Sequence, residues 1–242
     1  MTTPLLDVRA VTKRFGGLVA NREISFQVEA GELVGVIGPN GAGKSTLFGL
    51  VTGFQVPDTG DIRLDGVPIA GLRPDQISRR GVARTFQKLK PFNAMTVLEN
   101  VMVGAFQNTR DPREARAQAE HALESVGLAD RARAHARVLS TGQRKRLEMA
   151  RALATRPRLL LLDEVTGGVD QRTIPELVRL VRELHAGGLT LLVIEHNMRV
   201  ITAVAQRIVA LHLGEVIADG TPDVVARDRR VVEAYLGQAY LP

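Results

Sequence analysis

The sequence of 242 residues contains no cysteine and no tryptophan, and it has only two tyrosines. Without cysteine the chain forms neither disulfides nor thiolate metal sites, which leaves the cellular compartment undecided. The scarcity of aromatic rings argues against stacking on single-stranded nucleic acid, so we expect no nucleic-acid partner. The net charge of +6 comes largely from scattered arginines. We interpret clusters such as Arg144, Lys145 and Arg146 as a solvated helix face.

Long apolar runs are also lacking. No run reaches the roughly 20 residues that a membrane-crossing helix needs. The longest runs, Leu159–Leu162 and Leu189–Ile194, have the length of strands. Because the first residues show no basic segment followed by an apolar stretch, we expect no signal peptide and a cytosolic location. Apolar residues make up 45% of the chain, which is enough for a substantial core.

The most informative segment is a glycine-rich loop between an apolar strand, expected at 33–37, and a helix, expected at 46–51. It matches the phosphate-loop pattern G-x-x-x-x-G-K-[ST]. Glycines let backbone N–H groups curl around phosphate oxygens, and the helix N-terminus adds its positive dipole end. The alternative is a glycine-rich turn that matches by accident. The candidate phosphate-binding residues are Gly38, Pro39, Asn40, Gly41, Ala42, Gly43, Lys44, Ser45 and Thr46, with Lys44 reaching the β- and γ-phosphates and Ser45 a ligand for Mg²⁺.

Two carboxylates follow the apolar run at 159–162. Asp163 and Glu164 follow four leucines that predict a fully buried central strand. Ligands bind at the carboxyl ends of strands in open α/β sheets. Asp163 is therefore suited to hold Mg²⁺ through water, and Glu164 to deprotonate an attacking water. An ordinary acidic strand end is the alternative, which the phosphate loop makes less favourable.

Hydrophobic periodicity organises the remaining chain. Period-two alternation and turn glycines predict antiparallel strands within 5–30 and near 61–66. Capping patterns predict helices from Thr96, over 115–126 after Asp111, and over 141–155. Strands at 159–163 and 190–194 then alternate with a helix over 175–186, and a hairpin around Gly214 follows. This alternation predicts an α/β protein with a parallel sheet.

A short segment before the third of these helices resembles a known signature. Residues 139–143 read Leu-Ser-Thr-Gly-Gln, which is similar to the LSGGQ signature of the ABC-transporter ATPase family, with Thr141 in place of the first glycine. In that family the signature contacts a nucleotide held by the other subunit. The resemblance therefore implies a head-to-tail dimer with two sandwiched ATPs. It assigns Ser140, Gly142 and Gln143 to the partner's nucleotide.

The resemblance extends over essentially the whole chain and implies further roles. Phe15 falls where the family has an aromatic residue that stacks on adenine, although a core phenylalanine is a rival interpretation. Gln87 matches the glutamine that senses Mg²⁺ and links the two subdomains. Asp170 matches an aspartate that contacts the partner subunit, and His196 suits a contact with the γ-phosphate or the attacking water. Val165 stands where the family usually has proline, which is expected to loosen the loop of Glu164 without removing a catalytic group.

The resemblance also implies the fold and its division. We expect one ABC ATPase domain over 1–242, with a P-loop NTPase (RecA-like) core. Residues 1–87 and 156–242 would form this core with an antiparallel β subdomain, and 88–155 an inserted helical subdomain that carries the signature. The segment 88–93 is where family members dock a helix of the membrane subunit. Pro91 and Phe92 would offer an apolar contact there, or would pack on their own domain.

Several short motifs resemble the branch that energises importers of branched-chain amino acids, among them residues 14–18, 81–87, 95–100, 195–198 and 234–237. This implies an ATPase on the cytoplasmic face of the inner membrane. Its partners would be permease subunits, a second ATPase subunit (the same chain or a paralogue) and, indirectly, a periplasmic solute-binding protein. The alternatives are urea or amide import, lipopolysaccharide export, a soluble ABC ATPase without a transport role, and a nucleotide-binding regulator that does not turn over.

Overall fold

The computed structural model describes residues 3–86 and 91–236, with the side chain of the last one left aside. The first of its two sheets is antiparallel and has the strand order β2-β1-β4-β5. A glycine turn at Gly16 joins the two long strands. Burial alternates at Ile24, Phe26 and Val28 of β2, and the apolar residues Leu6, Val8 and Val11 of β1 are also buried. The strands are β1 (Leu6–Phe15), β2 (Leu18–Val28), β4 (Thr59–Leu64) and β5 (Val67–Pro68).

The second sheet has six strands in the order β10-β9-β3-β8-β7-β6. Neighbouring strands from β9 to β6 run parallel, and β10 pairs antiparallel with β9 at the edge. The three central strands are buried at every position, which explains their unbroken apolar runs. The strands are β3 (Leu33–Ile37), β6 (Val82–Arg84), β7 (Leu159–Asp163), β8 (Thr190–Ile194), β9 (Arg207–His212) and β10 (Glu215–Gly220).

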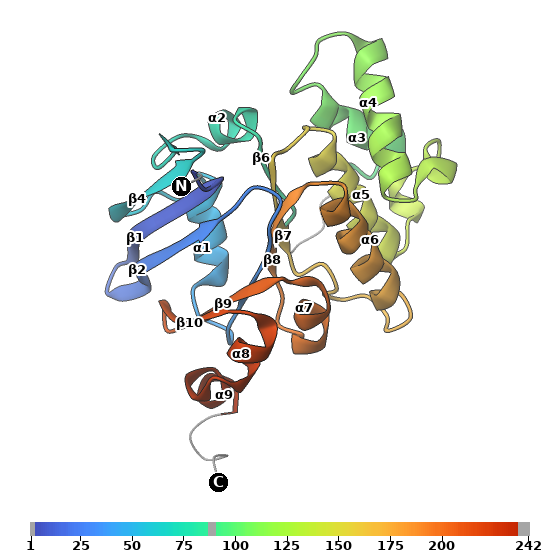
Figure 1. Ribbon diagram of the computed structural model, residues 1–242. Coiled ribbons are helices and arrows are strands. Elements are labelled where there is room, and N and C mark those ends of the chain that lie inside the picture. The colour runs from blue at the N-terminus through green and yellow to red at the C-terminus, as the bar shows by residue number, and fades with distance from the viewer. Residues whose placement is uncertain (1–2, 87–90, 237–242) are drawn as a thin grey trace.

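Helix α1 (Lys44–Val51) lies between the two sheets (Figure 1). Its apolar residues, such as Leu47 and Phe48, are fully buried in a core shared by strands of both sheets. The helix follows β3 through the glycine-rich loop, so the loop opens at the carboxyl end of a central strand. The helix begins at Lys44, two residues before the start that the sequence predicted, and it ends before Gly53 as expected.

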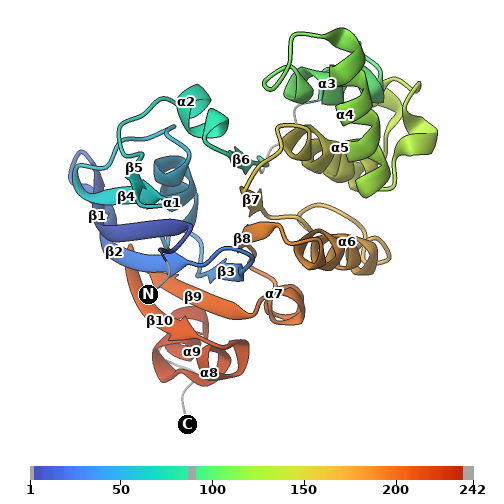
Figure 2. The ribbon, with the colours of Figure 1, turned by 45° about the horizontal axis from the view of Figure 1, so that its top comes forward.

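Three helices pack on one another at the far side of β6 and β7 from the antiparallel sheet (Figure 2). Thr96 and Asp111 cap two of them with their side chains, as the sequence predicted. Lys145 on the third is only 4% exposed, so the solvated face expected for its cluster is wrong at this residue. The helices are α3 (Val97–Ala105), α4 (Pro112–Ser125) and α5 (Thr141–Leu153), and the short α2 (Pro74–Arg79) precedes β6.

The last third of the chain alternates strand and helix. Helix α6 (Ile174–Ala186) joins β7 to β8, and α7 (Met198–Val204) joins β8 to β9. Helices α8 (Pro222–Arg227) and α9 (Arg229–Leu236) follow the β9–β10 hairpin and lie beside it (Figure 1). Among residues 3–86 and 91–236, no helix has the length and apolarity needed to cross a bilayer.

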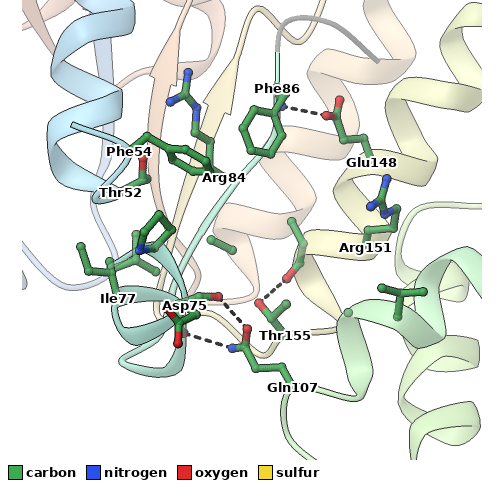
Figure 3. Close-up of a pocket in the computed structure, with 17 residues that line it drawn as sticks. Thr52, Phe54, Asp75, Ile77, Arg84, Phe86, Gln107, Glu148, Arg151 and Thr155 are labelled. Atoms are coloured by element: carbon green, nitrogen blue, oxygen red, sulfur yellow. Dashed lines mark hydrogen bonds between the residues drawn. The ribbon is translucent and has the colours of Figure 1, made fainter. Parts of the chain in front are cut away.

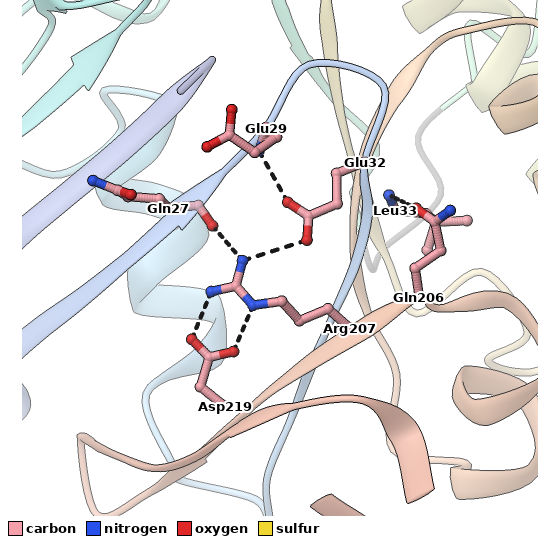
Figure 4. A network of polar contacts seen from close by, with 7 residues as sticks. All are labelled: Gln27, Glu29, Glu32, Leu33, Gln206, Arg207 and Asp219. Carbon is pink, nitrogen blue, oxygen red and sulfur yellow. Dashed lines mark hydrogen bonds and ion pairs between the residues drawn. The ribbon is translucent and has the colours of Figure 1, made fainter. Parts of the chain in front are cut away.

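An arginine joins the two sheets at the edge next to β9. Arg207 donates bidentate hydrogen bonds of 2.6 Å to both carboxylate oxygens of Asp219 (Figure 4). It also donates to the backbone oxygen of Gln27 on β2 and to the carboxylate of Glu32. These carboxylates raise the pKa of the guanidinium further above its usual value. The planar guanidinium is permanently charged and donates to four oxygen atoms, which come from β10, β2 and the turn at Glu32. Arg207 therefore fixes β2 relative to the β9–β10 hairpin.

Candidate nucleotide-binding site

The phosphate loop is held in a shape that requires glycine at two close approaches. Gly38 has φ +152°, and a Cβ there would lie 2.2 Å from the backbone oxygen of Leu211. Gly43 has φ +98°, and its Cβ would lie 2.4 Å from the backbone oxygen of Ala20. Neither distance leaves room for a side chain. The loop is therefore wedged between β2 and β9 at the carboxyl end of β3, with its last residues starting α1.

Lys44 folds back over this loop. Its ammonium donates hydrogen bonds to the backbone oxygens of Gly38 (2.6 Å) and Pro39 (3.0 Å). Burial lowers the pKa of Lys44, and the carboxylates of Glu164 and Asp163 offset part of that shift. Because the side chain is only 8% exposed, the cation is aimed at the loop rather than at bulk water. An oxyanion bound in the loop would exchange these neutral carbonyl acceptors for charged ones.

A cavity of about 560 Å³ lies over the loop. Phe15 lies at this cavity and is 46% exposed, so the rival interpretation of Phe15 as a core residue is wrong. The Lys13 ammonium lies 5.6 Å from the centre of its ring. The cavity thus combines backbone N–H groups, a cation, a carboxylate and an aromatic ring. Its lining comprises Phe15, Gly17, Leu18, Val19, Ala20, Arg22, Asn40, Gly41, Ala42, Gly43, Lys44, Ser45, Thr46, Glu164 and Leu213.

Asp163 ends β7 and is 3% exposed. Its Oδ2 accepts a 2.6 Å hydrogen bond from the guanidinium of Arg84 at the end of the neighbouring strand β6. The same guanidinium lies 5.5 Å from the ring centre of Phe48 and 5.4 Å from that of Phe86. A buried carboxylate is costly unless it is paired, and Arg84 supplies that pair. Sequence reasoning assigned no role to Arg84, although its place at the carboxyl end of a parallel strand was a usable signal.

Glu164 and His196 lie at the ends of the adjacent strands β7 and β8. The Oε1 atom of Glu164 is 3.8 Å from Nδ1 of His196. Glu164 has φ +52°, an unusual backbone conformation for a residue other than glycine. The Glu164 side chain reaches the cavity over the phosphate loop, whereas the His196 side chain is 57% exposed. The structure therefore brings together the two side chains that the sequence expected near a γ-phosphate.

The segment after Glu164 is firmly held. Val165, which replaces the expected proline, is 4% exposed and belongs to the core. The backbone N–H and the hydroxyl of Thr166 both donate to the buried carboxylate of Glu195. Hydrogen bonds from the backbone N–H of Glu164 to Ile194 and from Gly167 to Glu164 complete the turn. The turn is thus hydrogen-bonded without the proline, and the effect of Val165 on the loop stays a prediction.

The signature segment lies at the start of α5, away from the cavity. Ser140 and Gln143 form a reciprocal capping box, with bonds of 3.3 and 3.0 Å. A Cβ on Gly142 would meet the Thr173 methyl group at 2.6 Å. Thr173 in turn donates its hydroxyl to Asp170, whose carboxylate also caps the following turn, and these bonds lower the pKa of Asp170. Of these residues, none lines the 560 Å³ cavity.

Gln87 lies outside the residues that the structure describes, so its expected role stays a prediction. Two other contacts at the site were missed by the sequence reasoning. Tyr235 of α9 accepts a hydrogen bond from the N–H of Gly38. Lys145 donates to the backbone oxygen of Glu164. Contacts of this kind join residues far apart in the chain, and the sequence offered no pattern that pointed to them.

Known protein families match this chain in two places. Residues 21–167 match the family described as ABC transporter. The chain belongs to the ABC transporter family. Residues 215–240 match a second family, described as branched-chain amino acid ATP-binding cassette transporter. The first match includes the phosphate loop, the signature and the Asp163–Glu164 pair, which confirms the resemblance that the sequence indicated.

Curated relatives match this ABC protein over almost its whole length. The high-affinity branched-chain amino acid transport ATP-binding protein BraF of Pseudomonas aeruginosa is 41% identical, covering 99% of this chain and 100% of the relative. LivG of Escherichia coli K12, described in the same words, is 38% identical with the same coverage. The lipopolysaccharide export system ATP-binding protein LptB of Acidithiobacillus ferridurans is 35% identical over 98% of both chains.

Solved structures confirm the expected fold class. The ADP conformation of the ATP-binding cassette MJ1267 superposes with a TM-score of 0.88 at 32% identity, covering 98% of this chain and 100% of that one. The ADP- and phosphate-bound dimer of the cassette MJ0796 superposes with a TM-score of 0.80 at 28% identity, covering 90% and 98%. The chain is thus an α/β P-loop NTPase of the ATP-binding cassette type.

Proposed function

We propose that this chain is the ATP-hydrolysing subunit of a membrane ABC importer for branched-chain amino acids. The observation that carries the proposal is the full-length match to BraF and LivG, combined with a complete phosphate loop and a Glu164–His196 pair at its cavity. The match of residues 215–240 to the C-terminal segment of branched-chain amino acid cassettes favours this substrate over lipopolysaccharide.

In this mechanism the loop N–H groups and Lys44 bind the β- and γ-phosphates, and Phe15 stacks on the adenine. Glu164 accepts the proton of an attacking water, because its carboxylate enters the cavity beside the loop. His196 lies within 3.8 Å of that carboxylate and orients it or contacts the γ-phosphate. The residues act mainly by positioning and by stabilising charge, which is how most phosphoryl transfer is catalysed.

The donors present fit a magnesium ion that arrives with the nucleotide. Within the described residues, no group of three or more acidic, histidine or cysteine side chains is placed to hold a metal ion by itself. Mg²⁺ is commonly held by one or two protein oxygens together with phosphates and water. The Ser45 hydroxyl and the Asp163 carboxylate, with Gln87, would supply those oxygens. The ion would neutralise charge on the β- and γ-phosphates.

We further propose that two copies, or this chain and a paralogue, act as a head-to-tail dimer. Ser140, Gly142 and Gln143 do not line the cavity over their own phosphate loop, so they are available to a nucleotide held by another subunit. Asp170 would lie at the same interface. In this arrangement each γ-phosphate is bound by both subunits, so ATP closes the dimer and hydrolysis opens it.

A second cavity, of about 370 Å³, is our candidate for docking of the permease. It lies where α2, β6, α3 and α5 meet, with Phe86 on one wall and Glu148 and Arg151 on the other (Figure 3). Phe54 and Phe86 form an edge-to-face pair with 5.7 Å between ring centres, and Phe86 is 43% exposed. Exposed aromatic rings beside charged groups are typical anchors for a partner helix.

Residues 88–93 are the segment expected to dock a helix of the permease. This segment begins outside the described residues, and its end flanks the cavity. Phe92 is 43% exposed, and the Arg151 guanidinium lies 4.8 Å from its ring centre. This placement supports the division into a core (1–87 and 156–242) and a helical subdomain (88–155), because the cavity lies between α3 and α5 on one side and α2 and β6 on the other. We place the assembled protein on the cytoplasmic face of the inner membrane, with a periplasmic solute-binding protein acting indirectly.

Two measurements test the proposal. The purified chain should hydrolyse ATP, and E164Q, which keeps the side-chain shape, should bind ATP with hydrolysis reduced by at least about 100-fold. Cells that depend on this transporter should import labelled leucine with the native chain and not with E164Q, while urea uptake stays unchanged. Absence of hydrolysis by the native chain would overturn the enzyme assignment. Normal leucine uptake with E164Q would overturn the substrate and leave urea, amides and lipopolysaccharide to be tested.

A further inference from the structure

Lys145 is a buried lysine on the helix that carries the signature. Its side chain lies on α5 and is 4% exposed. Its ammonium donates a 2.6 Å hydrogen bond to the backbone oxygen of Glu164. Lysine is rarely so deeply buried, because removing an ammonium from water is costly unless acceptors compensate. A side chain that only needed to cover the core would not require this charge.

The atom that Lys145 binds is the backbone oxygen of Glu164, the residue taken as the catalytic base. The φ of +52° is a strained conformation for a residue with a side chain, so the surroundings must hold it. Backbone hydrogen bonds from Glu164 to Ile194 and from Gly167 to Glu164 come from β8 and from the turn itself. The bond from Lys145 comes from a different element, α5. It therefore makes the conformation of Glu164 depend on where α5 lies.

Helix α5 also carries the residues that face the other subunit in the proposed dimer. Ser140 caps the helix, and Lys145 follows five positions later, about one and a half turns along a rigid element. A displacement of the signature on engaging the partner's nucleotide would move Lys145 with it. Since a shift of about 1 Å in a catalytic group can cost about 100-fold in rate, even a small displacement would matter.

We infer that Lys145 is a positioning residue which couples the two nucleotide sites of the dimer. The ammonium holds the Glu164 carbonyl in place when α5 is in its observed position. The position of Glu164 at one nucleotide therefore depends on the same helix whose signature contacts the second nucleotide of the dimer. The inference rests on the proposed function, because it takes Glu164 as the base and a dimer with two composite sites.

The test is steady-state ATP hydrolysis by the purified full chain with three substitutions. K145M removes the donor and keeps an unbranched side chain one atom shorter, whereas K145R keeps a charged donor. R146M is the matched control, because Arg146 on the same helix donates to the backbone oxygen of Val126 and to Glu176 instead. Thermal unfolding and ADP binding verify that each variant is folded and retains its nucleotide site.

For K145M we expect kcat to fall by at least about tenfold, KM for ATP to change by less than about threefold, and the Hill coefficient to fall towards one. K145R should retain at least about a third of the native kcat, and R146M should leave kcat and the Hill coefficient unchanged. A purely structural role of Lys145 predicts a lower unfolding temperature in K145M with an unchanged Hill coefficient. That result, or a native kcat in K145M, would overturn the inference.

If K145M does not fold, K145Q replaces it, since its amide nitrogen ends one atom short of the Lys145 ammonium and the same losses are expected. A native chain that lacks hydrolysis would instead contradict the proposed function. The two failures are therefore distinguishable, because the inference is tested only by differences from an active native chain.

Discussion

The phenol oxygen of Tyr235 accepts a 2.8 Å hydrogen bond from the backbone N–H of Gly38. The last helix of the described chain thus contacts the first residue of the phosphate loop, although 197 positions separate the two residues. Burial raises the pKa of the Tyr235 hydroxyl, and the bond from Gly38 offsets part of that shift. The loop that binds phosphate is therefore held from outside by α9 as well as by its own glycines.

Replacing Tyr235 with phenylalanine should loosen the loop. Y235F leaves the Gly38 N–H without its partner, which costs about 1 to 2 kcal/mol at a partly buried site. We expect the free energy of unfolding to fall by about that amount and the Kd for ADP to rise several-fold, measured by urea unfolding and calorimetry. R230Q, which removes an exposed ion pair on the same helix, is the control and should change neither quantity. Unchanged ADP affinity in Y235F would show that α9 does not support the loop.

Arg84 should stabilise the fold through Asp163. R84M would leave a 3% exposed carboxylate without its partner, and breaking a buried pair in this way costs about 3 to 5 kcal/mol. Urea unfolding at neutral pH measures the loss. In a D163N background the same substitution should cost far less, because no charge remains to be compensated. Equal costs in both backgrounds would mean that the stacking of Arg84 on Phe48 and Phe86, rather than the ion pair, stabilises the protein.

Glu148 should give the stability a defined pH dependence. Burial raises its pKa to about 6 from an ordinary value of 4.5, although the N–H of Phe86 donates to the carboxylate. A raised carboxyl pKa means that the folded protein holds the proton more tightly than the unfolded chain. The native protein should therefore lose stability relative to E148Q as the pH rises from about 4.5 to about 6, and no further above that.

The size of this loss should be on the order of 1 kcal/mol, because part of the carboxyl remains accessible to water. Urea unfolding of both proteins at intervals between pH 4 and pH 8 measures the difference. A difference that stays constant across this range would show that Glu148 has an unshifted pKa.

Gly142 and Thr173 should behave as a packing pair. In G142A the new Cβ meets the Thr173 methyl group at 2.6 Å, and such overpacking costs about 1 to 3 kcal/mol. T173S removes that methyl group and keeps the hydroxyl, which donates a hydrogen bond to Asp170. The double variant should therefore regain most of the stability that G142A loses, measured by thermal unfolding. If it does not, the strain arises elsewhere in the turn.

The same pair separates two reasons for a glycine in the signature. If Gly142 is needed only for packing against Thr173, ATP hydrolysis should recover together with stability in the double variant. We expect stability to recover while hydrolysis stays reduced, because a methyl group at position 142 would also approach the partner's nucleotide. Full recovery of hydrolysis would argue against a direct contact between Gly142 and nucleotide.

The sequence by itself determined the parts that depend on local chemistry. Glycine spacing predicted the phosphate loop, unbroken leucines predicted the buried strand β7, and the capping patterns at Thr96 and Asp111 placed two helix starts. Each of these signals lies within a few residues, where backbone conformation and burial are set by neighbouring side chains. The family and the fold class followed from such motifs in sequence order.

Only the tertiary structure decided which distant groups meet. The Tyr235–Gly38, Arg84–Asp163 and Lys145–Glu164 contacts join residues from different elements. The order of the strands brings the second pair together, and the packing of α9 and α5 brings the other two together. The sequence placed Lys145 on a solvated face, because a cluster of basic residues has the same composition whether or not one of them faces a carbonyl. Burial and hydrogen bonding are properties of the packed chain, so a contact between remote residues has no signature in either local segment.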